Sequence, residues 1–254
     1  MAARSYGQYC GVTTAVELIG ERWALLIVRD LLVGPRRYTD LKQGLPRIPT
    51  NILSTRLKEL QEGGVVRRAP LHGSGLVYEL TPYGQALEPI VLALGRWGFQ
   101  AMGDPDEGDV VTPDSLTMAL RTSFRPDRAR RLDVELHVGD VALRAIVRDG
   151  LLAVTQLAPP APPVGGAVPP GDPEAVIVAG PGIRHLIAGD VTPAEAIAQD
   201  LVAVVRGDER ILDDFAQTFH IAPPRGVASP RGGTVGRRIP SPSKGSTTKE
   251  QSTS

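Results

Sequence analysis

Short hydrogen-bonding side chains gather in residues 48–64, IPTNILSTRLKELQEGG. If this segment is a helix, its apolar positions form one narrow stripe: Leu53, Leu57 and Leu60. The opposite face and its flank then carry donors and acceptors: Asn51, Ser54, Thr55 and Lys58. Such side chains bond base edges in the major groove of DNA and the backbone oxygens beside it. The alternative is an ordinary solvated surface helix.

Basic residues around this segment extend the candidate DNA contacts. Arg56 lies nearer the apolar edge, where its stem can pack while its guanidinium reaches a phosphate. Arg67, Arg68 and His72 fall on a predicted hairpin, suited to phosphate or minor-groove contact. The complete candidate set for DNA contact is Arg36, Arg37, Thr50, Asn51, Ser54, Thr55, Arg56, Lys58, Arg67, Arg68 and His72.

The elements that would position these residues follow from periodicity and from helix and turn signals. Residues 12–33 predict two helices that break near Gly20, and Gly34-Pro35 ends the second. A short helix with Thr39 as its N-cap precedes a helix that Thr50 caps and Gly63-Gly64 end. The remaining elements are a hairpin over 65–68 and 76–80, and one long helix from Pro82 to about Trp97. This order matches a helix-turn-helix with a wing, in which the second helix of the motif reads the DNA.

The second half of the chain changes to a period of two. Strands are predicted at 134–138, 141–148 and 151–157, joined by Gly-Asp and Asp-Gly turns, with further strands at 175–180 and 201–207. Helices are predicted at 113–124, 182–188, 193–200 and 208–219. We therefore predict an α+β chain: a winged helix-turn-helix domain (1–103), a linker (104–112), an antiparallel-sheet α+β domain (113–222) and a disordered basic tail (223–254).

Charge and cysteine content narrow the class of protein. Residues 1–103 hold 12 Lys/Arg and 8 Asp/Glu, whereas residues 104–225 hold 11 and 19, so the two parts favour different partners. The single cysteine excludes an intrachain disulfide and fits a reducing cytoplasm. The N-terminus lacks the pattern of a signal peptide, and no run approaches the ~20 apolar residues of a membrane span. We expect a cytoplasmic protein that does not contact a membrane.

No pattern for catalysis or for a cofactor is evident. The four histidines lie far apart without metal-ligand spacing, and no phosphate loop or dinucleotide fingerprint is present. We therefore expect no enzyme activity, no metal and no cofactor. Cys10 is a redox candidate if a helix N-terminus lowers the pKa of its thiol, and an inert thiol otherwise.

Residues 9–98 resemble the HxlR family of bacterial winged-helix transcriptional regulators. The resemblance rests on Ile19-Gly20 followed by Trp23, and on LLVGPRRYTDL, LSTRLKEL and YELTPYG. Two departures are Arg22 and Gly11, where the family often has Lys and Pro. The resemblance implies a homodimer in which N- and C-terminal helices of two subunits pack together, and the position of Cys10 matches a redox switch of some relatives. The expected dimer interface is Val16, Ile19, Leu87, Ile90, Val91, Leu94 and Trp97.

Residues 113–219 resemble the sterol-carrier-protein-type-two-like fold, through VELHVGDVALRAIVRDGLLAV and LVAVVRGDERILDDFAQTF. That resemblance implies an apolar tunnel and hence a hydrophobic small-molecule partner that modulates DNA binding. The expected pocket residues are Leu136, Leu143, Ala145 and Ala153. Two alternatives remain: the apolar faces fill a core, or the chain is a lipid or small-molecule binding protein whose front domain serves mainly for dimerisation.

Overall fold

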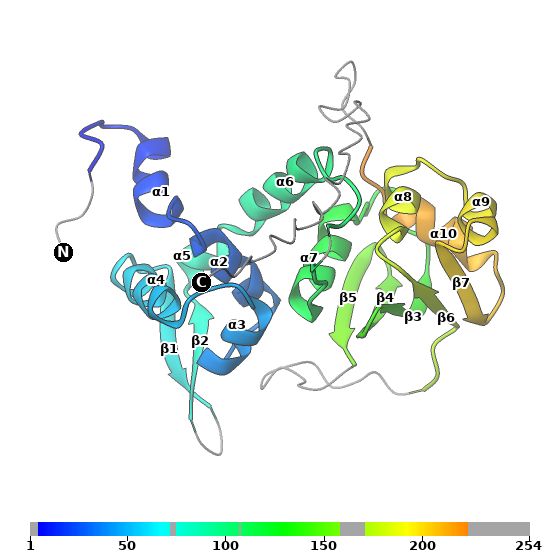
Figure 1. The fold of residues 1–254 in the computed structure, drawn as a ribbon, viewed down its shortest axis with the longest axis horizontal. Helices are drawn as coiled ribbons and strands as arrows, with labels where there is room; N and C mark the ends of the chain where they lie inside the picture. Colours follow the sequence, from blue (N-terminus) through cyan, green and yellow to red (C-terminus); the bar gives the residue numbers. More distant parts are fainter. Residues whose placement is uncertain (1–4, 72–74, 107, 158–170, 223–254) are drawn as a thin grey trace, which may run out of the picture.

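Helix α7 (Pro113–Ser123) lies between the two parts of the chain in the computed structural model (Figure 1). Two hydrophobic cores meet at this helix. The structure describes residues 5–71, 75–106, 108–157 and 171–222. The predicted tail 223–254 lies outside this range. None of the helices in the described ranges is long and apolar enough to cross a bilayer.

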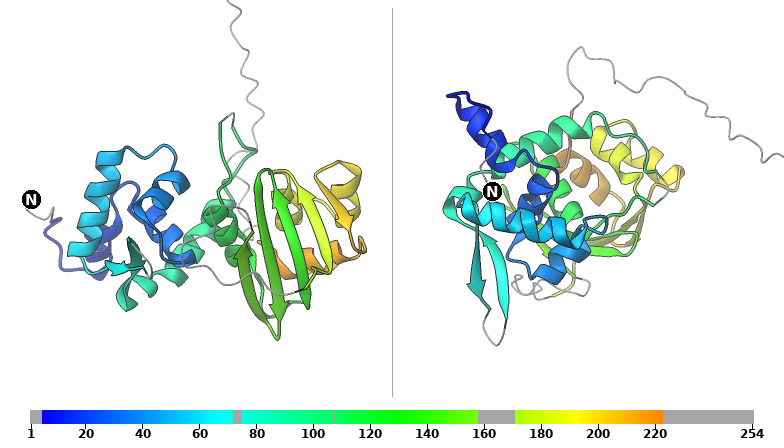
Figure 2. Two further views of the ribbon diagram at one scale, coloured as in Figure 1. Left: turned by 90° about the horizontal axis from the view of Figure 1, so that it is seen from below. Right: turned by 60° about the vertical axis from the view of Figure 1, so that its left-hand side comes forward.

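Six helices and a hairpin form the N-terminal part. The helices are α1 (Gly11–Ile19), α2 (Ala24–Val33), α3 (Tyr38–Gly44), α4 (Thr50–Glu62), α5 (Pro82–Gln85) and α6 (Glu88–Phe99). Strands β1 (Val66–Pro70) and β2 (Leu76–Leu80) pair antiparallel and project from the helices as a wing (Figure 2). The predicted order of helix-turn-helix and wing is therefore present.

Three local predictions need correction. Arg37 occupies the N-cap position of α3, so Thr39 lies within the first turn, and Pro49 rather than Thr50 occupies that of α4. The long helix predicted after Pro82 is two helices. Pro89 explains the break, because proline lacks the N–H for the bond to residue 85 and its ring clashes with that carbonyl.

The C-terminal part is a five-stranded sheet with helices. Its strands are β3 (Leu132–Val138), β4 (Val141–Arg148), β5 (Leu151–Gln156), β6 (Ala175–Ala179) and β7 (Val202–Arg206), in the order β5-β4-β3-β6-β7. Its helices are α7, α8 (Ile183–Ala188), α9 (Pro193–Ala198) and α10 (Ile211–Thr218). The sheet is mixed, not antiparallel as predicted. β3, β4 and β5 form a meander, and β6 returns to pair in parallel with the free edge of β3.

Alternation along the strands decides which side of the sheet is packed. In β3 every second residue, from Leu132 to Val138, is buried, as the extended backbone requires. These inward side chains share one core with residues of α7, α8, α9 and α10.

Helix α7 belongs to both cores. Leu116 and Leu120 lie in the core of the sheet, whereas Met118 lies in the core of the N-terminal helices. Gly95 of α6 also approaches α7 closely, because a Cβ at this position would lie 2.9 Å from the side chain of Thr122. The two parts of the chain are thus packed together through one helix.

Candidate nucleic-acid interface

Helix α4 buries one stripe and exposes the predicted reading face. Its three leucines are at most 1% exposed, and they attach the helix to the N-terminal core: Leu53, Leu57 and Leu60. Thr50, Asn51, Ser54 and Lys58 are exposed and Thr55 is half-buried. The structure therefore places these five predicted DNA-contact residues on the outer side of one helix.

Two hydroxyl groups on this face already form hydrogen bonds within the protein. Ser54 Oγ and Thr55 Oγ1 donate to the carbonyl oxygens one turn earlier, at 3.1 and 2.9 Å. Tyr38 of α3 donates to Thr50 O at 2.9 Å, and its hydroxyl lies 3.1 Å from Ser54 Oγ. Thr55 Oγ1 can therefore still accept a hydrogen bond, whereas Ser54 Oγ already shares one with the Tyr38 hydroxyl, in which either oxygen can be the donor. Sequence reasoning missed Tyr38, because nothing in its neighbours along the chain indicates a contact twelve residues away.

Arg56 is not placed as predicted. Its side chain is only 15% exposed and forms ion pairs with Glu21, at 2.9 Å, and with Glu59. Two carboxylates therefore hold the guanidinium against the protein, and Arg56 is not available to a phosphate in this structure.

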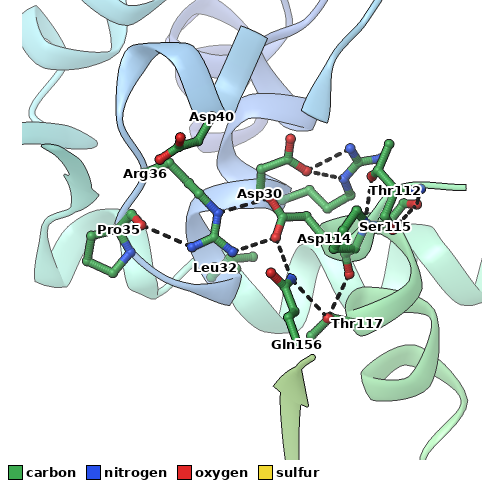
Figure 3. A network of polar contacts seen from close by, with 12 residues as sticks. Asp30, Leu32, Pro35, Arg36, Asp40, Thr112, Asp114, Ser115, Thr117 and Gln156 are labelled. Atoms are coloured by element: carbon green, nitrogen blue, oxygen red, sulfur yellow. Dashed lines mark hydrogen bonds and ion pairs between the residues drawn. The ribbon is translucent and has the colours of Figure 1, made fainter. Parts of the chain in front are cut away.

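Arg36 is also wrong as a predicted DNA contact, because it is 3% exposed. Its Nε and Nη2 donate to the two carboxylate oxygens of Asp114, at 3.0 and 2.5 Å (Figure 3). Its Nη1 donates to Pro35 O at 3.0 Å. Because this guanidinium is buried and its fork is filled by Asp114, DNA cannot reach it in this structure.

Residues of the wing and of the start of α3 remain exposed. Arg67 pairs with Glu79 across the hairpin at 2.7 Å and is still 63% exposed. The Arg68 guanidinium lies 5.7 Å from the ring centre of Tyr78, and Arg37 is exposed. His72 lies outside the described residues. The exposed arginines provide positive charge beside the face of α4.

Cys10 is exposed at the N-cap of α1. Hydrogen bonds from the backbone N–H groups of Thr13 and Val12 lower the pKa of its thiol. Exposure and a lowered pKa are what a reactive thiol needs. The redox role itself stays a prediction.

The predicted dimer residues separate into two groups. Ile19 is 9% exposed and belongs to the chain's own core, so it is not an interface residue, and Leu87 and Val91 are half-buried against the same core. In contrast, none of the residues of α6 is fully buried. Large apolar side chains are exposed on α1 and α6: Val12, Val16, Ile90, Leu94 and Trp97.

The interior of the C-terminal part is filled where a pocket was predicted. Leu136, Leu143 and Ala145 have no exposed surface and lie in the packed core, whereas Ala153 is exposed on the other side of the sheet. Two surface hollows of about 340 Å³ each are lined mainly by charged residues. The first is lined by Arg131, Asp133, Asp172 and Glu174. The second is lined by Glu174, Ala175, Asp208, Arg210, Ile211 and Asp214. Three of the four predicted pocket residues thus lie in the core and Ala153 faces away from it, so nothing in the described residues supports the predicted pocket. Among the described residues, no cluster of His, Cys, Asp or Glu is suited to hold a metal ion.

Comparison with known proteins agrees with this geometry in the N-terminal part. Residues 18–106 match the family model described as HxlR-like helix-turn-helix. The uncharacterized HTH-type transcriptional regulator YvaP of Bacillus subtilis (strain 168) is 40% identical over 88 residues, which cover 34% of this chain and 82% of that protein. The chain belongs to the HxlR-like helix-turn-helix family.

One further relative, YodB, matches the chain both as a sequence and as a solved structure. The HTH-type transcriptional regulator YodB of Bacillus subtilis (strain 168) is 34% identical over 89 residues, covering 34% of this chain and 80% of that protein. The crystal structure of quinone-bound YodB from B. subtilis shows 34% identity, covers 36% of this chain and 98% of that one, and has a TM-score of 0.32. The relatives are named as transcriptional regulators, which confirms the prediction that the chain is not an enzyme. The HxlR match ends at residue 106, before α7 begins.

Proposed function

We propose that this HxlR-family chain is a transcriptional regulator that binds double-stranded DNA through the outer face of α4. The observation that carries this proposal is the division of α4 into a fully buried leucine stripe and an exposed face of short polar side chains. Asn51 and Thr55 are the proposed base readers, with Thr50, Ser54 and Lys58 beside them. Arg37, Arg67 and Arg68 contact phosphates, which position a protein on DNA without reading its sequence.

A selected DNA tests this assignment. Duplexes that the wild-type protein enriches from a random library serve as the probe. Replacing Asn51 and Thr55 together with alanine should cost about 1–3 kcal/mol per lost base contact and relax the sequence preference. Arg68→Ala should instead weaken all duplexes alike and reduce the salt slope by about one.

The controls make the outcome decisive. Gln199→Ala, at the exposed C-terminal end of α9 and away from α4, is a control substitution that should leave affinity and specificity unchanged. Unaltered affinity and preference in the Asn51→Ala, Thr55→Ala variant would contradict this docking. Failure of the wild type to enrich any duplex would contradict DNA binding itself.

Dimerisation is the second part of the proposal. The exposed apolar residues of α1 and α6 form a surface too apolar to leave in water on a small domain. Two-fold packing of these helices would bring two α4 helices onto a roughly palindromic site, about one DNA turn (~34 Å) or a multiple apart.

The sterol-carrier-like resemblance of the C-terminal part stays a prediction. The five-stranded sheet covered by helices supports a two-layer α+β domain. Its packed interior favours a structural role over a hydrophobic ligand, and over the alternative of a lipid-binding protein. A panel of fatty acids and sterols should therefore leave the thermal unfolding midpoint unchanged, and a saturable rise would restore the ligand hypothesis.

A further inference from the structure

Arg36 connects the wing to the helix-turn-helix through its backbone. Its N–H donates to Tyr78 O at 2.9 Å, and its carbonyl accepts from Tyr78 N–H at 2.7 Å. Thus Arg36 adds one residue to the edge of strand β2. The next residue, Arg37, is the N-cap of α3, and the carboxylate of Asp40 accepts its N–H at 2.8 Å. The position of Arg36 therefore sets both the wing and the first helix of the motif.

The side chain of Arg36 points the other way, into the C-terminal part (Figure 3). Asp114 of α7, which is 7% exposed, accepts both arms of its guanidinium fork. Gln156, at the end of β5, donates to Asp114 Oδ1 at 2.8 Å and to Thr117 Oγ1 at 3.3 Å. A chain of direct hydrogen bonds thus runs from the sheet through α7 to Arg36.

Helix α7 is held firmly enough to transmit this contact. Arg121 donates to Leu32 O, near the end of α2, at 2.9 Å. Arg121 also pairs with Glu88 of α6 at 3.6 Å, and Arg96 of α6 donates to Thr122 O at 3.0 Å. Helix α7 therefore contacts both α6, the helix proposed for dimerisation, and Arg36, which precedes α3 of the DNA-reading motif.

We infer that Asp114 is a positioning residue for DNA recognition, which acts through Arg36 to fix the wing and α3 relative to the dimer helices. This inference rests on the proposed DNA-binding function. The C-terminal part, which lies beyond the HxlR match, would then hold the DNA-reading motif in position.

The energetics favour this role over a merely stabilising one. A buried ion pair adds little net stability compared with apolar residues, but its fork allows one geometry only. Removing one partner leaves a buried charge without compensation, which favours conformations in which the other partner moves toward water. Here the other partner is Arg36, whose backbone is paired with the wing.

The test measures specificity as the ratio of affinities for a duplex selected by the wild-type protein and for an unrelated duplex. Asp114→Asn should lower this ratio about two- to thirtyfold, the range of coupling through packed networks. Affinity for the unrelated duplex and the salt slope should not change, because no phosphate contact is lost. Gln156→Ala, at a half-buried position, removes only the hydrogen bonds to Asp114 and Thr117 and should lower the ratio in the same direction by less.

Asp133→Asn is the matched control. Asp133 forms a similar two-armed pair with the 4%-exposed Arg144, at 2.7 and 3.1 Å, but within the sheet and away from the reading motif. Thermal unfolding of each variant fixes a temperature at which all are folded. The inference is overturned if Asp114→Asn keeps the wild-type ratio, or if Asp133→Asn lowers it equally.

Arg36→Gln separates a direct from an indirect role. A salt slope flatter by about one would mean that Arg36 itself contacts phosphate, and would overturn the inference. A reduced ratio with an unchanged slope supports it. If the wild type enriches no duplex, the proposed function fails rather than this inference.

Discussion

At the scale of single residues, the most unusual group is Asp30 of α2. Its side chain has no exposed surface, and one of its carboxylate oxygens has no hydrogen-bond partner. Burial raises its pKa from 3.8 to about 7; Asp114 raises it too, and Arg29 and Arg36 oppose this. A Cβ on Gly44 would lie 3.0 Å from the unpartnered oxygen, so a side chain at residue 44 would crowd this carboxyl.

This raised pKa predicts a loss of stability as pH increases. Between pH 3.8 and about 7 the folded protein holds a proton on Asp30 that the unfolded chain releases, so the free energy of unfolding falls as pH rises through this window. The loss between pH 5 and pH 8 should be about 3 kcal/mol, and Asp30→Asn should abolish it. Urea unfolding at both pH values measures the difference.

Asp208→Asn is the control for this titration. Asp208 is paired with Arg210, whose hydrogen bonds lower its pKa to about 2, so its contribution is lost only as pH falls below the ordinary range of a carboxyl. Between pH 5 and 8 this variant should keep the wild-type pH dependence. An Asp30→Asn protein with the same pH dependence as the wild type would exclude a buried proton at this site.

At the scale of elements, Gly84 fixes the junction of the wing and α5. Alanine normally stabilises a helix relative to glycine by about 1 kcal/mol. At Gly84, however, a Cβ would lie 2.2 Å from the carbonyl oxygen of Val65, so backbone must move. We expect Gly84→Ala to lower the free energy of unfolding by about 1–3 kcal/mol, the usual cost of overpacking, as measured by urea unfolding.

Gly98→Ala in α6 is the opposite case. No atom lies within 4 Å of the position that a Cβ would take there, so helix propensity should decide the result and the variant should gain up to about 1 kcal/mol. Equal effects of both substitutions would show that the approach of Val65 to α5 is not a constraint.

At the scale of the whole molecule, the apolar surface of α1 and α6 predicts the dimer. Leu94 is 44% exposed on α6. Leu94→Glu introduces a charge twice into a two-fold interface and removes the burial of two leucines, so the dimer dissociation constant should rise at least about 100-fold. Sedimentation equilibrium at micromolar concentration measures the change.

Leu151→Glu is a matched control on the other part of the chain. Leu151 is 75% exposed at the start of β5. Its substitution should leave the dimer intact. A wild-type protein that sediments as a monomer at micromolar concentration would contradict the proposed assembly.

The sequence alone determined the elements that local patterns specify. The leucine spacing and the flanking Pro49 and Gly63 predicted α4 and its outer face, because a helix of fixed pitch converts spacing directly into direction. The pairs Gly139-Asp140 and Asp149-Gly150 predicted the β3-β4-β5 meander, because such pairs favour the tight turns that join hairpin strands. The break between α5 and α6 could also have been predicted from the sequence, because Pro89 lacks the N–H that a continuous helix needs.

Only the tertiary structure decided which charged residues remain available. Arg36 and Arg56 look alike in sequence to Arg67 and Arg68, yet the first two are held by Asp114, 78 residues away, and by Glu21, 35 residues away. The parallel pairing of β6 with β3 and the filling of the sheet's interior also depend on segments distant along the chain. These contacts depend on how distant segments pack in three dimensions. The periodicity of a sequence gives information only about residues within a few turns of each other, so it does not predict them.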